Sequence, residues 1–217
     1  MSSKLAHYIK TLLTDFSAIA DNRKLILTQL ATSISRELDT KSSANLIFIC
    51  THNSRRSQLA EVWAKMAAEY YGLTSIATYS GGTEATAFYP AVIAALERAG
   101  FDIRKMDETP NPKYRIQLGM GDRTQSCFSK EYSNEFNPQN DFLAIMVCSD
   151  ADEHCPIVVG AKTRIVLPYI DPKIADGTAE EAATYDARSL EIATEMFFVM
   201  GKVKEPKKNR EENERRK

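Results

Sequence analysis

The sequence lacks the features that would place the protein at a membrane or on a nucleic acid. Its 217 residues contain 28 lysines and arginines against 29 aspartates and glutamates, a formal net charge of −1. No excess of basic side chains is available to neutralise phosphates, which argues against a dedicated nucleic-acid-binding protein. The chain has no run of about 18 apolar residues, so we expect no membrane partner. The N-terminus lacks the basic, apolar and small-residue pattern of a signal peptide, and we therefore expect a cytoplasmic protein.

Cysteine is also scarce, with only four residues in the chain. Structural disulfides rarely persist in the reducing cytoplasm, so four cysteines there favour catalytic or redox use. The length of the chain is that of one α/β domain of moderate size with an appendage.

Residues 1–40 carry two helical repeats of apolar side chains. The repeats consist of Leu5, Ile9, Leu12, Phe16 and Ile19, and then of Ile26, Leu30, Ile34 and Leu38. This spacing is typical of amphipathic helices. We predict an N-terminal helical extension with its connector over residues 1–43. Its helices pack either on the main domain or on a partner subunit, and the second alternative would make a homodimer.

From residue 44 onward, strand patterns and helix patterns alternate. The strands are expected at 45–50, 75–80, 142–148 and 164–169, and the helices at 57–71, 90–100 and 179–203. Such alternation is typical of βαβ units and a parallel sheet. We predict one α/β domain over 44–203. Prolines and glycines break the pattern around 104–140, which we interpret as an irregular insertion. The charged tail over 204–217 is predicted to be disordered.

The most informative stretch is the junction between the first strand of this domain and the helix that follows. Cys50 ends the strand, and Arg56 and Ser57 begin the helix. Loop N–H groups and the positive end of a helix dipole favour a tetrahedral oxyanion. The Arg56 guanidinium can donate to two of its oxygens, and the Ser57 hydroxyl can donate to a thiolate. These groups would lower the pKa of the Cys50 thiol from about 8.5. The junction therefore predicts an oxyanion site that contains a nucleophile.

Asp171 follows the last predicted strand and precedes Pro172. Ligands of parallel sheets bind at the carboxyl ends of the strands, where both Cys50 and Asp171 are expected. A carboxylic acid there can protonate a departing oxygen. Asp-Pro is also a common turn dipeptide, which is the alternative interpretation.

The residues of this junction resemble a known family. The run Cys-Thr-His-Asn-Ser-Arg-Arg-Ser-Gln-Leu-Ala-Glu from Cys50 resembles the anion loop of the low-molecular-weight protein tyrosine phosphatase superfamily. More narrowly, it resembles the thioredoxin-coupled arsenate reductases built on that fold. Residues 79–85 and 171–181 resemble two further motifs of the family, and the resemblance covers about 45–203 outside the insertion. It implies a four-stranded parallel sheet with helices on both faces.

The resemblance also implies which residues bind an arsenate or phosphate-like oxyanion. These are the loop residues Thr51, His52, Asn53, Ser54, Arg55 and Ser57. Asn53 is matched, and in the family it holds the loop in its strained shape, since an amide side chain tolerates left-handed geometry. His52 departs from the family, which usually has glycine there. Its side chain would narrow the site, add positive charge as an imidazolium, or point outward.

Cys148 and Cys155 lie seven residues apart with an acidic segment between them, and they match the redox segment of the reductases. Such a pair supplies two electrons by thiol–disulfide exchange, whereas a phosphatase needs only one cysteine. C-x6-C is not a usual zinc spacing, and only His154 is nearby, so we expect no metal and no cofactor. Two inert thiols remain the alternative. Cys127 is interpreted as a spare thiol.

The resemblance therefore implies an arsenate reductase. Cys50 would attack arsenate held by Arg56 and protonated by Asp171, and Cys148 and Cys155 would pass the disulfide to a thioredoxin-type reductant. This relay requires the 148–155 segment to move. The first alternative is a tyrosine or phosphomonoester phosphatase that uses Cys50, Arg56 and Asp171. Against it, no aromatic pair flanks Asp171 in the sequence. The second alternative is an anion-sensing module without turnover. Lys130 and Arg123 are interpreted as solvated.

Overall fold

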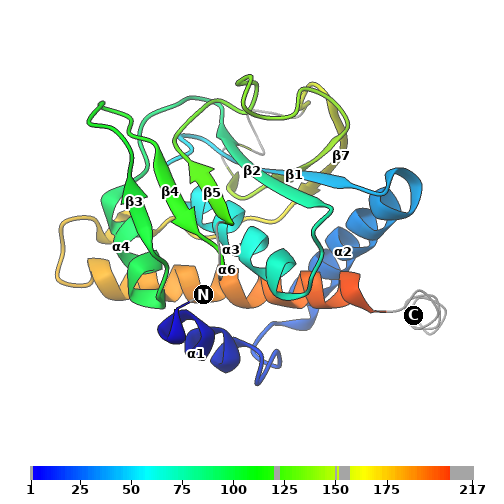
Figure 1. Cartoon of the computed structure of the whole chain (residues 1–217), viewed down its shortest axis with the longest axis horizontal. Helices are drawn as coiled ribbons and strands as arrows, with labels where there is room; N and C mark the ends of the chain where they lie inside the picture. Colours follow the sequence, from blue (N-terminus) through cyan, green and yellow to red (C-terminus); the bar gives the residue numbers. More distant parts are fainter. Residues whose placement is uncertain (1, 120–122, 150, 152–156, 206–217) are drawn as a thin grey trace.

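A parallel sheet of four strands lies at the centre of the protein. The computed structural model describes residues 2–119, 123–149, 151 and 157–205 (Figure 1). The spatial order of the strands is β2 (Ile76–Gly82), β1 (Ala44–Cys50), β6 (Phe142–Met146) and β7 (Ala161–Val166). Every neighbouring pair is parallel. The four-stranded parallel sheet predicted from the sequence is confirmed.

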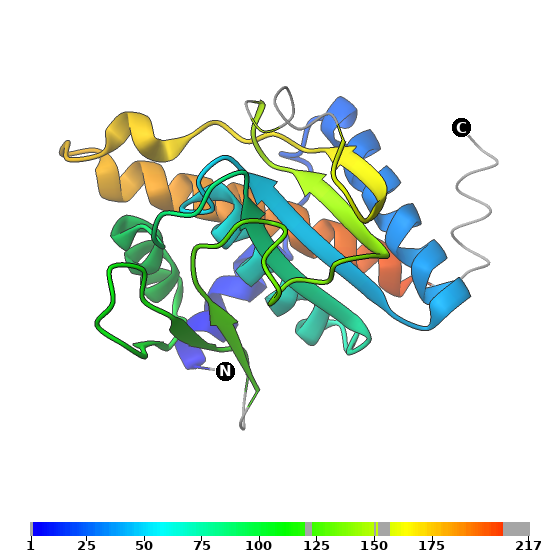
Figure 2. The same cartoon turned by 90° about the horizontal axis from the view of Figure 1, so that it is seen from above.

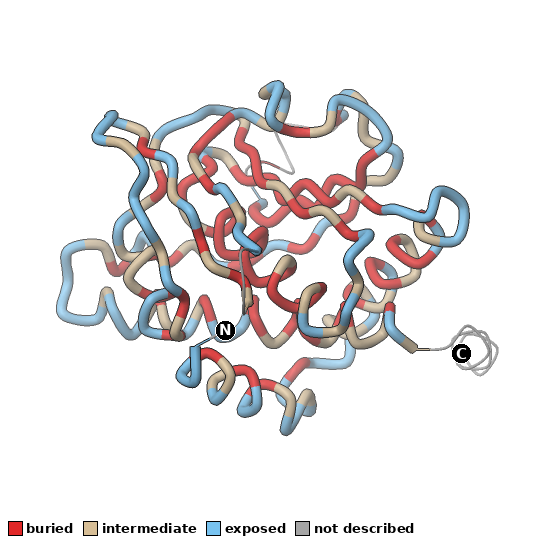
Figure 3. Tube along the Cα trace, in the orientation of Figure 1, coloured by how far each residue is buried: buried red, intermediate tan, exposed pale blue. Residues whose placement is uncertain are grey.

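The helices of the main domain are α3 (Arg56–Tyr70), α4 (Pro90–Ala99) and α6 (Glu181–Lys204). Helix α3 packs against β1, β2 and α6, and α6 also contacts α4. In Figure 1, α3 and α6 lie below the sheet. The core also fills the contact between α3 and α6, where Trp63 is fully buried and donates to Ser189. The buried segments follow the central strands and the inner sides of the helices (Figure 3).

The N-terminal extension forms two helices, α1 (Ser3–Leu12) and α2 (Asp21–Lys41). Their inward side chains are almost wholly buried: Leu5, Ile9, Leu27, Leu30 and Ile34. Leu27 takes the inward place that we expected for Ile26. Helix α2 packs against α6 of the same chain, and α1 contacts α6 and α4. The extension is therefore helical as predicted and packs on its own main domain. The homodimer stays a prediction.

The segment 104–140 is not irregular throughout, as we had expected. It contains most of a small antiparallel sheet of β3 (Ile103–Lys105), β4 (Tyr114–Gln117) and β5 (Thr124–Cys127). Each strand has only three or four residues, too few for a period-2 pattern to stand out. Residues after β5 run beside the end of β2, where Gly82 N donates to Lys130 O and Tyr132 N donates to Gly82 O. This segment therefore reaches the edge of the main sheet.

No helix in the described part of the chain is long and apolar enough to cross a membrane. The tail predicted over 204–217 lies outside the described residues from 206 onward. The division into extension, domain with insertion, and disordered tail stays a prediction.

Candidate active site

The candidate active site lies at the carboxyl edge of the parallel sheet. The arrowheads of all four strands point the same way, so their carboxyl ends meet at one edge (Figure 2). Strand β1 pairs with β2 on one side and with β6 on the other. The connection to β2 therefore lies on one side of β1, and the strands that come later in the chain lie on the other side. In parallel sheets of this kind, ligands bind at the carboxyl ends of the strands, at the place where the strand order reverses. Cys50 ends β1, Cys148 follows β6, and Asp171 follows β7.

Asn53 organises the loop between β1 and α3. Its backbone has a φ of 48°, in the left-handed region that asparagine tolerates better than most residues. Its Nδ2 donates to Ser57 Oγ at 2.8 Å, and its Oδ1 accepts from Lys130 N at 2.9 Å. Gln58 Nε2 donates to the Asn53 carbonyl at 3.0 Å. Asn53 thus makes the loop-holding hydrogen bonds that we expected of it.

The loop is packed directly against the end of β2. Glu84 N donates to Thr51 O at 3.0 Å, and Thr83 N donates to Cys50 O at 3.2 Å. A Cβ atom on Gly82 would lie 2.5 Å from Thr51 O and 2.2 Å from Glu84 O. Only glycine fits this approach without a backbone shift. The amide N–H groups of residues 52–56 donate to no acceptor in the described part of the chain, so they are available to an oxyanion.

The Cys50 thiol is buried beside Ser57, with 3.0 Å between Sγ and Ser57 Oγ. Burial raises the pKa of the Cys50 thiol, and nearby Cys148 raises it further. The Ser57 hydroxyl, the Ser57 N–H and the Arg56 charge lower the pKa but do not outweigh burial. Our expectation of a lowered pKa is therefore wrong for this structure. The reason is that the thiol is buried, and loss of contact with water disfavours its charged form more than the neighbouring groups favour it.

Arg56 donates to both the backbone and the carboxylate of the segment after β7. Its Nη1 donates to Tyr169 O at 3.0 Å, and its Nη2 donates to Asp171 Oδ2 at 2.6 Å. Asp171 Oδ1 accepts from Lys173 N and caps the 3₁₀ turn η1 (Pro172–Ala175). Arg56, the predicted anion-binding cation, and Asp171, the predicted acid, are therefore in direct contact.

Cys148 is wholly buried next to the same loop. Its Sγ lies 3.6 Å from Thr51 Oγ1 and accepts from Ala151 N at 3.3 Å. It is close enough to Cys50 to affect the pKa of that thiol. Cys155 and the segment predicted to move lie outside the described residues, so they stay predictions. Cys127 is a buried free thiol on β5, away from these hydrogen bonds.

Some of the loop side chains expected to bind the oxyanion have other partners. His52 is half exposed, and its Nε2 lies 2.9 Å from Glu84 Oε1. Ser54 Oγ donates to Ala87 O at 2.7 Å. The structure therefore favours the outward orientation of His52, and the side chains of these two residues are engaged with partners within the protein.

Arg55 joins the loop to the start of α6. Its Nη2 lies 2.5 Å from Asp176 Oδ2, and its Nε donates to Tyr185 OH at 2.6 Å. Its guanidinium lies 3.8 Å from the centroid of the Tyr89 ring, which stacks on Tyr185 at 5.6 Å. An aromatic pair therefore does lie near the loop, contributed by Tyr89 before α4 and Tyr185 on α6, and Tyr185 OH also donates to Asp176 Oδ1 at 2.6 Å. Arg55 and the pair are occupied with each other, not directed at a ligand.

Sequence reasoning missed the contacts that residues after β5 make with the loop between β1 and α3. Ser129 Oγ donates to His52 O at 3.0 Å. Lys130 is buried, and its ammonium lies 4.7 Å from the Phe128 ring and 5.4 Å from the Phe136 ring. Our interpretation of Lys130 as solvated is therefore wrong. It lies in a stretch without periodicity, where no local pattern signals burial.

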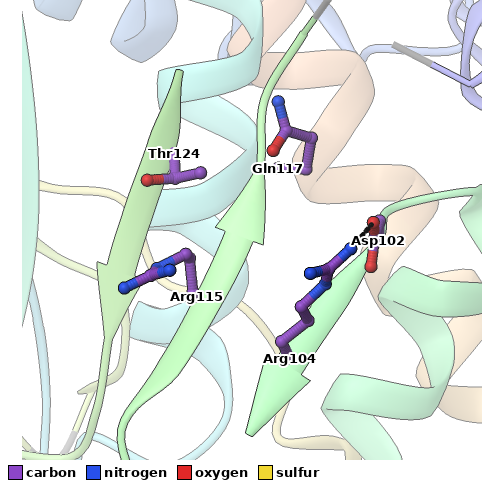
Figure 4. Close-up of a pocket in the computed structure, with 5 residues that line it drawn as sticks. All are labelled: Asp102, Arg104, Arg115, Gln117 and Thr124. Atoms are coloured by element: carbon purple, nitrogen blue, oxygen red, sulfur yellow. Dashed lines mark ion pairs between the residues drawn. The ribbon is translucent and has the colours of Figure 1, made fainter. Parts of the chain in front are cut away.

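A hollow of about 530 Å³ lies apart from this site, on the outer face of the small sheet (Figure 4). Its lining is polar and charged: Asp102, Arg104, Arg115, Gln117 and Thr124. Arg104 and Arg115 are directly opposite each other in the strand register. None of the site residues lines this hollow. In the described ranges, no group of three or more His, Cys, Asp or Glu side chains is placed to hold a metal ion.

Comparisons with known proteins identify the family to which the chain is similar. Residues 45–117 match the low molecular weight phosphotyrosine protein phosphatase family. The chain is 31% identical over 136 residues to an arsenate reductase of Bacillus subtilis (strain 168), covering 63% of this chain and 79% of that protein. It is 32% identical over 143 residues to an arsenate reductase of Bacillus licheniformis, covering 64% of this chain and 82% of that protein.

The fold also matches that of a solved structure. A crystal structure of a YwlE mutant from Bacillus subtilis aligns with a TM-score of 0.51 at 19% sequence identity. The alignment covers 75% of this chain and 100% of that one, so about a quarter of this chain lies outside it. The chain therefore belongs to the arsenate reductase family within the low-molecular-weight protein tyrosine phosphatase superfamily, and it is an enzyme.

Proposed function

We propose that the protein reduces arsenate to arsenite by a relay of three cysteines. The observation that carries this proposal is the position of Cys148, whose Sγ lies 3.6 Å from the hydroxyl of Thr51, the residue after Cys50. A hydrolase needs only the first cysteine, because water breaks the covalent intermediate. A reductase needs a two-electron donor, and a second thiol beside the first supplies it.

The first step makes a bond between sulfur and arsenic. The N–H groups of residues 52–56 and the Arg56 guanidinium hold arsenate, and the Cys50 thiolate attacks the arsenic atom. Asp171 protonates the departing oxygen, which leaves as water. The Ser57 hydroxyl, 3.0 Å from Cys50 Sγ, favours the thiolate over the buried thiol. The product is a covalent Cys50–arsenic adduct in which arsenic is still pentavalent.

The second step transfers two electrons to arsenic. The Cys148 thiolate attacks Cys50 Sγ, and the sulfur–arsenic bond breaks with its electron pair staying on arsenic, which leaves as arsenite. A Cys50–Cys148 disulfide remains. The Cys155 thiolate then attacks Cys148 Sγ and releases the Cys50 thiolate. A thioredoxin-type dithiol reduces the resulting Cys148–Cys155 disulfide. Since Cys148 is buried, the 148–155 segment must move before this reductant can reach it.

The alternative is a phosphatase that uses Cys50, Arg56 and Asp171 alone, with Asp171 later activating water. An aromatic surface for a phenolic substrate would favour this alternative. The Tyr89 ring lies near the loop, but the Arg55 guanidinium covers one face at 3.8 Å and Tyr185 stacks on it. The aromatic pair at the loop is therefore held by internal contacts, which favours a small inorganic oxyanion as substrate.

The test compares reduction with hydrolysis in the same set of variants. Arsenate-dependent NADPH oxidation is measured with thioredoxin and thioredoxin reductase, beside hydrolysis of 4-nitrophenyl phosphate. The variants are wild type, Cys148→Ser, Cys155→Ser and, as a matched control, Cys127→Ser. We expect both relay variants to lose arsenate turnover while they keep the phosphatase activity of the wild type. Cys127→Ser should keep both activities, since that thiol lies outside the site.

Two results would overturn the proposal. Wild type without arsenate turnover would exclude reduction. Relay variants as fast as wild type would exclude the roles of Cys148 and Cys155. Mass spectrometry of a trapped Cys50–Cys148 disulfide in the Cys155→Ser variant gives an independent check of the order of the steps.

A further inference from the structure

Helix α2 of the N-terminal extension is linked to the candidate active site by a series of hydrogen bonds that begins at Arg23. Arg23 donates to Glu195 on α6 with both arms of its guanidinium, Nε to Oε1 at 2.7 Å and Nη2 to Oε2 at 2.9 Å. The Glu195 side chain is 5% exposed, and that of Arg23 is 18% exposed. A bidentate pair of this kind fixes the orientation of both planar groups.

Tyr169 is held by the same pair. Its hydroxyl donates to Glu195 Oε2 at 2.5 Å, and the Arg23 guanidinium lies 4.7 Å from the centroid of its ring. Tyr169 is buried, and burial together with the Glu195 charge raises the pKa of its hydroxyl well above the ordinary value, so the hydroxyl stays a donor. Both the face and the polar end of this ring are therefore fixed by residues of α2 and α6.

The backbone of Tyr169 in turn contacts the candidate site. Its carbonyl accepts from Arg56 Nη1 at 3.0 Å, and its N–H donates to the carbonyl of Val147, the residue before Cys148. Asp171 is two residues further along the chain and accepts from Arg56 Nη2. A shift of Tyr169 would therefore move the acid and the guanidinium that pairs with it.

Arg23 comes from a part of the chain that precedes the family match, which begins at residue 45. We propose that Arg23, Glu195 and Tyr169 are positioning residues, through which the N-terminal extension fixes the Arg56–Asp171 pair for catalysis. The proposal rests on the site of the proposed function, but it does not depend on the cysteine relay. Hydrolysis of an aryl phosphate uses Arg56 and Asp171 without Cys148, so it tests the positioning by itself.

The leaving group distinguishes positioning of the acid from general damage. Phenol is a poor leaving group that needs the Asp171 proton, whereas 4-nitrophenol leaves with little help. In Arg23→Met we expect kcat/KM for phenyl phosphate to fall about tenfold more than kcat/KM for 4-nitrophenyl phosphate, since misplacement by an ångström can cost up to 100-fold. Arsenate reduction should fall like phenyl phosphate hydrolysis, because the departing oxygen of arsenate also needs a proton.

Two further variants keep the test informative if Arg23→Met folds poorly. Tyr169→Phe removes only the hydroxyl and should give the same leaving-group dependence at smaller size. Arg23→Lys keeps the charge and should restore part of the activity. Lys24→Met is the matched control on the same helix, because the ion pair of Lys24 is with a fully exposed Asp21, at 3.5 Å. It should behave as wild type.

The outcomes separate this proposal from the proposed function. Equal losses for the two aryl phosphates, or no loss, in both Arg23→Met and Tyr169→Phe would overturn the positioning role, because loss of folded enzyme lowers both rates alike. A wild type that hydrolyses aryl phosphates but does not reduce arsenate would overturn the relay and leave the positioning role standing.

Discussion

Arg56 Nη2 donates to Asp171 Oδ2 across 2.6 Å, which joins two residues 115 positions apart in the sequence. The other arm of the guanidinium donates to the Tyr169 carbonyl, so one planar group is oriented by two acceptors of the segment after β7. An oxyanion bound to Arg56 in the proposed reaction would therefore lie close to the Asp171 carboxyl. In that proposal, the same pair of residues would join anion binding to the supply of a proton.

This geometry predicts that lysine cannot replace Arg56. An ammonium lacks the planar fork, so it cannot hold the Tyr169 carbonyl, Asp171 and an oxyanion in fixed directions at once. In Arg56→Lys we expect kcat/KM for arsenate to fall about 100-fold. Steady-state kinetics with a coupled thioredoxin assay measures this loss.

The matched control for that variant is Arg98→Lys. Arg98 also forms an ion pair, with Asp186 at 2.8 Å, but both side chains are more than 40% exposed. Exposed pairs contribute little, so this variant should keep the activity of wild type. Equal losses in the two variants would contradict a special role of the Arg56 geometry.

The buried Cys50 thiol predicts a steep dependence of its reactivity on pH. Burial raises the pKa of Cys50, so we expect the reactive thiolate, and with it the rate of alkylation, to increase as the pH rises. The Ser57 hydroxyl lowers this pKa, so Ser57→Ala should raise it further and shift the reactivity curve to higher pH. The measurement is the rate of Cys50 alkylation by iodoacetamide between about pH 6 and 10, read by mass spectrometry of the Cys50 peptide. A curve that Ser57→Ala leaves in place, or shifts to lower pH, would contradict the stabilising role of this hydroxyl.

The main sheet and the gathering of the site could be predicted from the sequence, because both follow from local patterns. The apolar run before Cys50 predicts a buried strand, and parallel strands bring their carboxyl ends to one edge. Cys50 and Asp171 could therefore be placed at the same edge of the sheet, and Cys148 at the end of a strand. The family resemblance added the roles of the loop residues.

Contacts between distant side chains could not be predicted in this way. Arg23 and Glu195 are 172 residues apart, and each lies on a helix whose pattern states only which side faces inward. Lys130 is buried by two aromatic rings in a stretch without periodicity. The short strands β3, β4 and β5 escaped prediction because tertiary contacts, not propensity, hold elements of three or four residues.

The approach of β2 to the anion loop predicts that Gly82 tolerates no side chain. A Cβ there would lie 2.2 Å from Glu84 O and 2.5 Å from Thr51 O, and both are backbone atoms. We expect Gly82→Ala to lower the free energy of unfolding by more than about 2 kcal/mol. Gly119→Ala is the control, because its Cβ would meet nothing within 4 Å. Urea unfolding should separate the two, and similar midpoints would contradict this packing.

The pairing of Arg55 with Asp176 predicts a contribution to stability that depends on pH. Burial alone raises the pKa of Asp176, but hydrogen bonds from Tyr185 and Arg55 and the Arg55 charge outweigh it, so the pKa lies below its ordinary value of 3.8. A lowered pKa of a carboxyl in the folded state stabilises the protein above the pKa of the unfolded chain. This contribution is lost as the pH falls through the pKa of the folded state.

Arg55→Leu removes this contribution and leaves Asp176 without its cation. We expect the variant to lose about 2 kcal/mol of unfolding free energy at pH 7, since the pair is largely buried. The difference from wild type should shrink below about pH 4, where Asp176 becomes protonated in the variant first and then in wild type. Urea unfolding at pH 7, 5 and 3.5 measures it, with Lys24→Leu as the exposed-pair control that should show no such dependence. A difference that stays constant across this range would mean that Arg55 stabilises the loop through packing on Tyr89, and not through the charge of Asp176.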